Sequence, residues 1–231
     1  MINGLQKLTL LDYPEKVACT IFFGGCNFRC PFCHNASLVV KPRNCEQIEE
    51  ETVLAFLRKR QGVLDGVCIT GGEPLLQPGI EDFIRKVRAL GYAVKLDTNG
   101  YFPALLRHLV ETGLIDYVAM DIKNSPEYYP VTTGLSVLDL SPILESVEFL
   151  KTCGIPYEFR TTVVEGLHDE ERMAEIADWL EGVPRYFLQN FVDSGDLIAP
   201  GLSAVPKERM QKFLEIVKEK IPAAALRGIS A

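Results

Sequence analysis

The feature that most constrains the fold is a repeated alternation of short β-rich runs with longer amphipathic segments, punctuated by glycine and proline. The strand candidates are residues 17–23, 66–70, 93–97, 117–122, 156–164 and 185–190. The helix candidates are residues 46–60, 79–90, 103–112, 141–152, 169–180 and 207–220. Because a helix follows each strand, we expect parallel strands joined by right-handed crossovers. The alternation predicts an α/β fold built from six βα units.

Six units are too few to close a TIM-type barrel, which has eight and usually takes about 250 residues. We therefore expect the 231 residues to form a partial (β/α)6 TIM-type barrel in a single domain. Residues 1–16 would be an N-terminal extension, 17–220 the six βα units and 221–231 a C-terminal tail. In such a fold the reactive groups lie at the carboxyl ends of the strands.

Composition and charge restrict the environment and the partners of the chain. Hydrophobic residues make up 47% and charged residues 24%, which is typical of a soluble globular protein. No run approaches the roughly 18 apolar residues that a membrane span needs. The opening also lacks the basic start and apolar block of a signal peptide. A formal charge of −7 argues against binding to a phosphate backbone. We expect a cytoplasmic protein with no nucleic-acid or membrane partner.

Three of the seven cysteines lie within eight residues, in the segment FFGGCNFRCPFCHN after the first strand candidate. Cys26, Cys30 and Cys33 have the spacing C-x3-C-x2-C, and soft thiolates select zinc, Cu(I) or an iron–sulfur cluster. A structural zinc site needs a fourth ligand. His34 is poorly placed to be that ligand, and Cys45 lies twelve residues further on. A [4Fe–4S] cluster held at three corners would leave one iron open, and the spacing alone keeps both metals possible.

The remaining cysteines are expected to be small buried hydrophobes, because an odd count without an export signal argues against disulfides. They are Cys19, Cys45, Cys68 and Cys153.

The cysteine spacing, Phe32 before the third cysteine and the βα pattern resemble the radical S-adenosylmethionine (SAM) superfamily. The resemblance implies that Cys26, Cys30 and Cys33 hold a [4Fe–4S] cluster. It also implies that the cluster reduces bound SAM to methionine and a 5′-deoxyadenosyl radical, which abstracts hydrogen, so that no side chain acts as a catalytic acid or base. Phe32 and His34 would belong to the cofactor site.

The segment GVCITGGEPLLQ resembles the GGE motif of the superfamily, whose backbone binds the methionine part of SAM. Gly71 and Gly72 would permit close approach of a ligand, and Glu73 could accept hydrogen bonds from an ammonium group. By itself the segment is also typical of a tight turn after a strand.

Two carboxylates follow successive strand candidates, in the segments KLDTNG and AMDIKN, which resemble segments of the glycyl-radical-enzyme activases. On this resemblance Asp97, Thr98 and Asp121 would hold a monovalent cation beside the SAM carboxylate. Lys123 would contact that carboxylate directly. The alternative is structural: Asp97 and Asn99 would cap a turn. Asp121 would then pair with Lys123, because residues two apart in a strand share a face.

The fifth and sixth strand candidates add polar groups at the same end. In YEFRTTVVEG, Glu158, Arg160 and Thr162 alternate onto one face, and an inward arginine needs an anionic partner. The resemblance to the activases implies that Arg160 contacts SAM. In FLQNFVDSG, Gln189 and Asn190 stand where the pyruvate formate-lyase activase has a SAM-contacting histidine. That contact is either made by an amide, with Asn190 as the candidate, or absent.

Residues 4–35 resemble the start of the activating proteins of anaerobic ribonucleoside-triphosphate reductase. The resemblance implies a radical SAM oxidoreductase that removes the pro-S hydrogen from one glycine of a glycyl-radical enzyme. It also implies an electron donor such as flavodoxin or ferredoxin. Asp12, Tyr13 and Pro14 would either face the partner or form a structural turn.

Two other functions are compatible with the sequence. One is a radical SAM enzyme that acts on another glycyl-radical enzyme or on a small molecule. The other is a non-catalytic zinc-binding interaction module.

Overall fold

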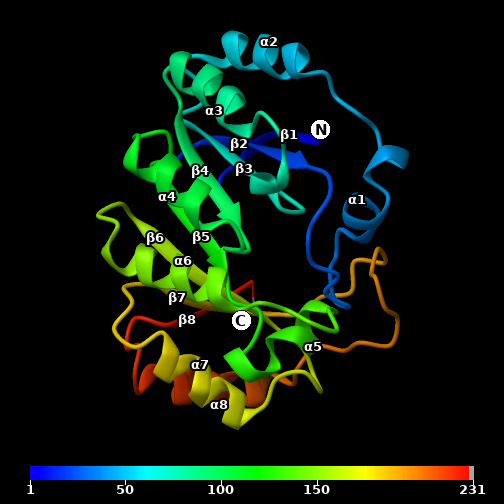
Figure 1. Cartoon of the computed structure of the whole chain (residues 1–231), viewed down its shortest axis with the longest axis vertical. Coiled ribbons are helices and arrows are strands. Elements are labelled where there is room, and N and C mark those ends of the chain that lie inside the picture. The colour runs from blue at the N-terminus through cyan, green and yellow to red at the C-terminus, as the bar shows by residue number, and fades with distance from the viewer. Residues whose placement is uncertain (229–231) are drawn as a thin grey trace. The chain divides into compact units, whose positions relative to one another are not determined.

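The computed structural model describes residues 1–228, which form eight strands (Figure 1). The strands are β1 (Ile2–Thr9), β2 (Ala18–Phe23), β3 (Gly66–Gly71), β4 (Ala93–Thr98), β5 (Tyr117–Asp121), β6 (Tyr157–Val163), β7 (Tyr186–Asn190) and β8 (Ala225–Arg227). Their order in the sheet follows their order in the chain. β1 pairs with β2 in the antiparallel sense, and the pairs β2–β3, β3–β4, β6–β7 and β7–β8 are parallel.

Helices connect the parallel strands. The longer helices are α2 (Glu50–Arg60), α3 (Ile80–Ala89), α4 (Pro103–Glu111), α6 (Ser141–Thr152), α7 (Glu170–Trp179) and α8 (Lys207–Lys218). The short ones are α1 (Ala36–Val40), α5 (Tyr129–Thr133) and the 3-10 turns η1 (Pro42–Asn44), η2 (Pro74–Leu76) and η3 (Pro126–Tyr128). Within residues 1–228, no helix combines the length and the apolar character that crossing a membrane requires.

The first of two compact units comprises Met1–Asn27, Ser37–Ala119 and Pro142–Pro156. The strands β2 and β3 are buried along most of their length, as expected for parallel strands covered on both faces. α3 buries Ile80, Phe83, Ile84 and Val87, which have the spacing of one helix face. α2 and α3 lie side by side (Figure 1).

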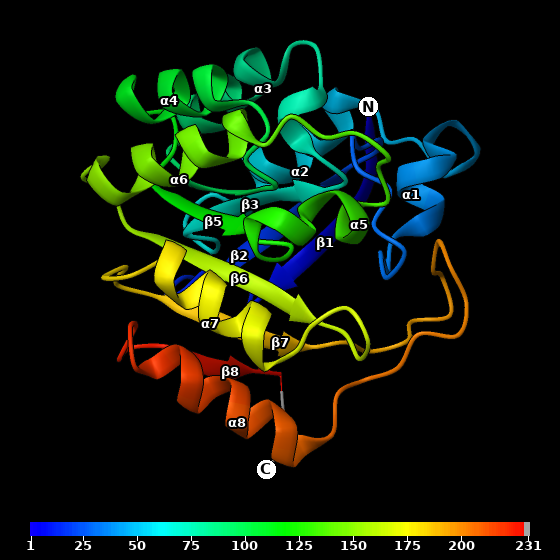
Figure 2. The same ribbon diagram turned by 60° about the horizontal axis from the view of Figure 1, so that its bottom comes forward.

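The second unit comprises Phe28–Ala36, Met120–Ser141 and residues 157 onward. Here α7 and α8 run side by side (Figure 2). α7 begins after Asp169, whose carboxylate caps the helix by accepting a hydrogen bond from the Arg172 backbone N–H at 2.9 Å. The buried side of α8 includes Met210, Phe213 and Val217, spaced by three and four residues.

The predicted α/β fold is confirmed, and each of the six strand candidates contains a strand. Two further strands were not predicted, because β1 lies in the expected extension and β8 in the expected tail. Residues 229–231 of that tail lie outside the described residues. β1 is antiparallel to β2 and lies outside the six βα units that were expected to supply parallel strands. This edge strand exposes Gln6, Lys7 and Leu8 in succession, so it lacks the alternation that marks a half-buried strand.

The helix expected over 46–60 begins only at Glu50. The reason is tertiary: the backbone N–H of Ile48 donates to the Ile2 carbonyl at 2.9 Å, which holds this segment extended against β1.

Candidate functional site

The GGE segment begins at Gly71, the last residue of β3, and is hydrogen-bonded to the end of β2 and the residues after it. The Gly72 N–H donates to the Phe23 carbonyl at 2.8 Å, and the Glu73 N–H donates to the Gly25 carbonyl at 2.9 Å. A Cβ on Gly71 would lie 2.2 Å from the Phe23 oxygen, and one on Gly72 would lie 2.0 Å from the Gly25 oxygen. Gly71 also has a φ of 124°, which side chains rarely adopt. Both glycines are therefore required by the close approach of two backbone segments.

Glu73 is fully buried and connects this turn to the end of β4. One carboxylate oxygen accepts hydrogen bonds from the Leu75 N–H at 3.0 Å and from the Thr98 hydroxyl at 2.9 Å. The other accepts from the Asn99 N–H at 2.7 Å. A carboxylate buried this deeply needs such donors. Glu73 thus fixes the DTNG loop against the GGE turn, and its oxygens have partners within the protein.

Asn99, expected from the sequence only as a turn cap, also contacts the cysteine motif. Its side-chain oxygen does accept the Tyr101 N–H at 3.0 Å, as in an Asx turn. Its amide nitrogen also donates to the Asn27 side-chain oxygen at 2.8 Å and lies 3.7 Å from the Cys26 sulfur. Asn99 therefore links the DTNG loop to the first cysteine of the motif, a contact with no signal in the local sequence.

Asp97 forms an ion pair with Lys95, two residues earlier on β4. The lysine side chain is only 2% exposed and the aspartate side chain 13%. The Lys95 ammonium also lies 3.8 Å from the sulfur of Cys68, its neighbour on β3.

In the second unit, Asp121 binds two cationic side chains. One oxygen accepts from Arg160 at 3.0 Å and 2.9 Å, and the other accepts from Lys123 at 2.9 Å. Burial raises the pKa of Asp121, but Arg160 and Lys123 outweigh burial and hold that pKa well below its usual range. Burial lowers the pKa of Lys123, and Asp121 in turn holds it above its usual range. Arg160 has the anionic partner that an inward arginine requires. The three side chains together carry a net positive charge.

We expect Asp121→Asn to lower the free energy of unfolding at pH 7 by about 1–3 kcal/mol, because it leaves two cations without their carboxylate. The depressed pKa means that this stabilisation is fully present above the unfolded aspartate pKa of about 3.9 and is lost as the pH falls through the folded value. Urea unfolding at pH 7 and in acid should therefore show the gap to wild type shrinking on acidification.

The exposed Asp82 supplies the control, since Asp82→Asn should have little effect at either pH. A gap for Asp121→Asn that stays constant in acid would contradict the assigned pKa direction.

The backbone of Lys123 is fixed on both sides. Its N–H donates to the buried Tyr129 hydroxyl at 3.1 Å, and its carbonyl oxygen lies 2.9 Å from Nε2 of His168. His168 is 1% exposed, and its Nδ1 accepts the Val164 N–H at 3.1 Å. This acceptor role places the proton on Nε2, which donates to Lys123. Burial lowers the pKa of His168, which favours this neutral form. His168 was not predicted from the sequence.

We expect His168→Leu to lower the free energy of unfolding by about 2–5 kcal/mol, because two buried backbone groups lose their partners. Urea denaturation followed by circular dichroism measures the change. His108→Leu is the matched control: His108 has a side chain 48% exposed, so a change under about 0.5 kcal/mol is expected. Equal effects of the two substitutions would show that His168 is not a buried anchor.

The second and third cysteines belong to a loop held by several backbone contacts within the second unit. The Arg29 N–H donates to the Thr133 carbonyl at 2.9 Å, and the Pro31 carbonyl accepts the Ala199 N–H at 3.0 Å. The Cys33 N–H donates to the Cys30 carbonyl at 3.0 Å. Phe32 is buried and anchors the loop, whereas His34 is exposed.

Whether an iron–sulfur cluster fits this protein depends on its cysteine thiols. None of the seven cysteines forms a disulfide, and Cys26, Cys30 and Cys33 offer three soft donors on one short segment, which is the chemistry that such a cluster requires. Cys26 belongs to the first unit and the other two to the second. Among residues 1–228, no three His, Cys, Asp or Glu side chains are gathered closely enough to hold a metal ion. The donor set therefore fits the chemistry of such a cluster.

Three predicted contact residues have structural roles within their units. The Asn190 amide donates to the Val205 carbonyl at 2.7 Å and accepts the Val205 N–H at 2.9 Å. Asp12 accepts the Thr20 hydroxyl at 2.5 Å, and Tyr13 is 2% exposed beside Tyr117. These contacts favour the structural alternative for Asp12 and Tyr13.

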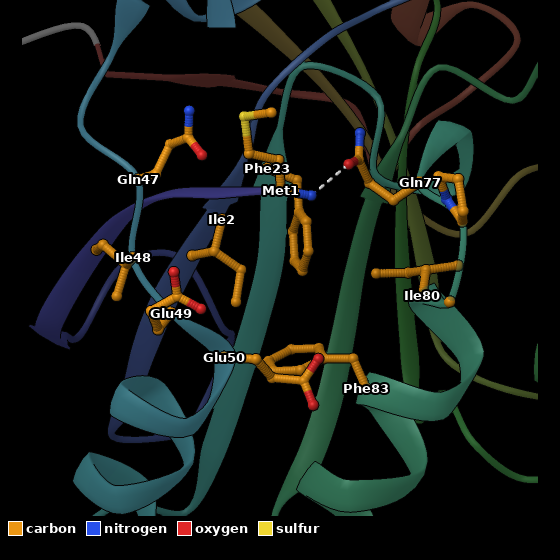
Figure 3. A pocket seen from close by; sticks show the side chains of 12 residues that line it. Met1, Ile2, Phe23, Gln47, Ile48, Glu49, Glu50, Gln77, Ile80 and Phe83 are labelled. Atoms are coloured by element: carbon orange, nitrogen blue, oxygen red, sulfur yellow. Dashed lines mark hydrogen bonds between the residues drawn. The ribbon is translucent and has the colours of Figure 1, made fainter. Parts of the chain in front are cut away.

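A pocket of about 220 Å³ lies in the first unit, between the start of β1 and the N-terminal ends of α2 and α3 (Figure 3). Its lining includes Ile2, Phe23, Ile80 and Phe83, and the Met1 amino group donates to Gln77 at its edge at 2.6 Å. No residue predicted for the cluster or SAM lines it.

Comparison with known proteins agrees with this arrangement of motifs. The model of the radical SAM superfamily matches residues 20–180. A protein of Methanocaldococcus jannaschii, provisionally named a glycyl-radical enzyme activating enzyme, is 30% identical over 100% of this chain and 97% of its own length. The pyruvate formate-lyase-activating enzyme of Clostridium pasteurianum is 27% identical over 94% of this chain and 97% of its own length.

Solved structures show the same fold at low identity. Streptococcus suis SuiB bound to S-adenosylmethionine has a TM-score of 0.69 and 14% identity over 90% of this chain and 52% of SuiB. Methylornithine synthase has a TM-score of 0.65 and 16% identity over 90% of this chain and 63% of the synthase. The chain thus spans about half the length of SuiB and less than two thirds of the synthase. The predicted fold class is confirmed.

Proposed function

Because this chain belongs to the radical SAM superfamily and is an activating enzyme for a glycyl-radical enzyme, we propose that its partner is an anaerobic ribonucleoside-triphosphate reductase. Superfamily membership implies a [4Fe–4S] cluster and SAM as cofactors. The observation that carries the choice of partner is the segment 4–35, which resembles the start of the reductase activators and contains all three motif cysteines. A cytoplasmic location is part of the same proposal.

In this proposal Cys26, Cys30 and Cys33 would hold the cluster through their thiolates. When bound, the cluster and SAM supply a 5′-deoxyadenosyl radical that takes the hydrogen atom from a glycine of the partner. The protein itself binds and orients these groups and keeps other hydrogen-atom donors away from the radical. Phe32 anchors the loop by its burial, and the exposed His34 stands at the loop surface.

The side chains around Asp121 supply the binding site for the carboxylate of SAM. Lys123 and Arg160 contribute two positive charges against the single negative charge of Asp121, so these three side chains together attract one further anion. His168 and Tyr129 act as positioning residues, because they fix the backbone of Lys123.

On the first unit, the GGE turn presents backbone groups to the methionine part of SAM, and Glu73 holds that turn in place. Thr98 serves the same framework, since its hydroxyl donates to Glu73 and accepts the Gly100 N–H at 3.1 Å. The Asn190 amide supports Val205, so a contact of Asn190 with SAM would require exchange of those hydrogen bonds.

The test of the partner is electron paramagnetic resonance after mixing. The cluster-loaded protein, reduced and supplied with SAM, is incubated without oxygen with the reductase from the same organism. We expect a glycine-centred doublet, and none with the Cys30→Ala variant. A doublet that appears only with a different glycyl-radical enzyme would contradict the proposed partner.

The electron donor is tested in the same assay. We expect reduced flavodoxin or ferredoxin to replace the chemical reductant and produce the doublet. If neither protein supports the signal while the chemical reductant does, the donor class is wrong and the activation proposal is unaffected.

A further inference from the structure

We propose that this enzyme binds SAM without a monovalent metal cation, because lysine and arginine side chains of the chain already neutralise both aspartates that would hold one. The proposal rests on the SAM site assigned above and concerns Asp97 and Asp121. It replaces the expectation that these carboxylates share a cation.

The counter-ion of Asp97 is the ammonium group of Lys95. The two residues are two apart on β4, so their side chains share a face of the strand. Lys95 is among the largest fully buried side chains of the described protein, and lysine is almost never fully buried unless it is paired. The ion pair with Asp97 accounts for this burial.

The surroundings of the Lys95 ammonium group favour a positive charge. The ammonium nitrogen lies 3.8 Å from the Cys68 sulfur and 5.9 Å from the centre of the Tyr117 ring. Both neighbours are electron-rich, and an aromatic face attracts a cation at such a distance. An ammonium carries the same charge as K⁺ and binds carboxylate oxygens in its place. The positive charge of Lys95 would repel a metal ion that approached Asp97.

Asp121 is neutralised within the second unit by two cations. Lys123 and Arg160 bind different oxygens of its carboxylate, at 2.9 Å in each case. The three groups together carry one excess positive charge, which suits an anionic ligand and opposes a further cation. Each aspartate therefore has its counter-ion inside its own unit.

The decisive variant removes the buried ammonium while retaining the carboxylate. Binding of SAM to the cluster-loaded chain is measured by calorimetry in KCl, NaCl and tetramethylammonium chloride at equal ionic strength. For the wild type we expect dissociation constants that agree within about twofold. For Lys95→Met we expect K⁺ to improve binding by about tenfold over tetramethylammonium, because Asp97 then accepts the metal.

Thermal unfolding of the same cluster-loaded chain without SAM gives a second readout that does not depend on activity. Lys95→Met should melt at a lower temperature than wild type in tetramethylammonium chloride and recover part of the loss in KCl. The double variant Lys95→Met/Asp97→Asn removes both charges and should recover stability without a response to K⁺. Lys86→Met is the matched control, because Lys86 forms a surface pair with Glu50 and is 54% exposed.

Wild-type SAM binding that requires K⁺ or Na⁺ would overturn the proposal. So would a Lys95→Met protein that responds to the cations no more than wild type does. If Lys95→Met does not fold, the double variant Lys95→Met/Asp97→Asn is measured in its place. An improvement of about tenfold in its SAM binding by K⁺ would also overturn the proposal, because Asp97 is then absent. The protein could show the expected dependence of SAM binding on cations and yet activate no glycyl-radical enzyme. That result would contradict the proposed function and support this inference.

Discussion

Alanine at any one of Cys26, Cys30 or Cys33 should abolish reductive cleavage of SAM. Each substitution removes one of only three thiolate ligands in the motif, and an iron–sulfur cluster depends on its cysteine ligands. The measurement is the amount of 5′-deoxyadenosine formed under anaerobic reduction, together with the iron content of each variant. We expect product below detection in all three variants.

Matched controls come from two cysteines outside the motif. Cys153 lies after α6, where its thiol is 3.7 Å from the Ile155 carbonyl, and the Cys45 thiol is 3.8 Å from the Lys41 carbonyl. Cys45→Ala and Cys153→Ala should retain wild-type iron and activity. Loss of the cluster in Cys45→Ala would identify a fourth ligand and favour a closed site. Activity that survives in all three motif variants would disprove the ligand assignment.

Glu73→Ala should be the most destabilising single substitution considered for the first unit. It removes the acceptor of three buried donors, at roughly 1–2 kcal/mol for each unsatisfied group, so we expect a loss of about 3–6 kcal/mol in the free energy of unfolding. Binding of SAM should be lost as well, because the GGE turn and the DTNG loop lose their common anchor. Urea denaturation and calorimetric titration with SAM measure the two effects.

Two variants define the mechanism of this loss. Glu73→Gln keeps one acceptor oxygen, but its amide NH2 group faces a donor on the other side. Its free energy of unfolding should therefore lie between those of wild type and Glu73→Ala. Glu46→Ala, at an exposed glutamate of the same unit, should change stability by less than about 0.5 kcal/mol. An undisturbed Glu73→Ala protein would mean that the carboxylate does not hold the two segments together.

The sequence predicted the parts of this protein that depend on local pattern. The βα alternation located the six strands β2 to β7, because the periods of strands and helices are visible in neighbouring residues. The pairing of Asp121 with Lys123, one of the two alternatives given by the sequence, agrees with their spacing of two residues. The sequence also predicted that Arg160 needs an anionic partner, but it did not identify Asp121 as that partner.

What the sequence could not predict depends on segments far apart in the chain. His168 reaches Lys123 across 45 positions, and Asn99 reaches Cys26 across 73. Glu158, 1% exposed on β6, is paired with Arg227, which lay in the expected tail and became part of β8. Such partners are chosen by tertiary packing, so no local spacing marks them. The exposed edge strand β1 was missed for a related reason, because its pairing with β2 defines it more than its own pattern does.

The proposed function requires that Cys26, Cys30 and Cys33 hold a cluster with one iron left open to SAM. Electron–nuclear double resonance on the reduced protein tests it most directly, with SAM labelled at the amino nitrogen and the carboxylate oxygens. We expect hyperfine coupling to both labels to appear when SAM is added and to be absent with a Cys30→Ala protein. A reduced cluster that shows no coupling to either label, with all four irons ligated by protein side chains, would contradict the account.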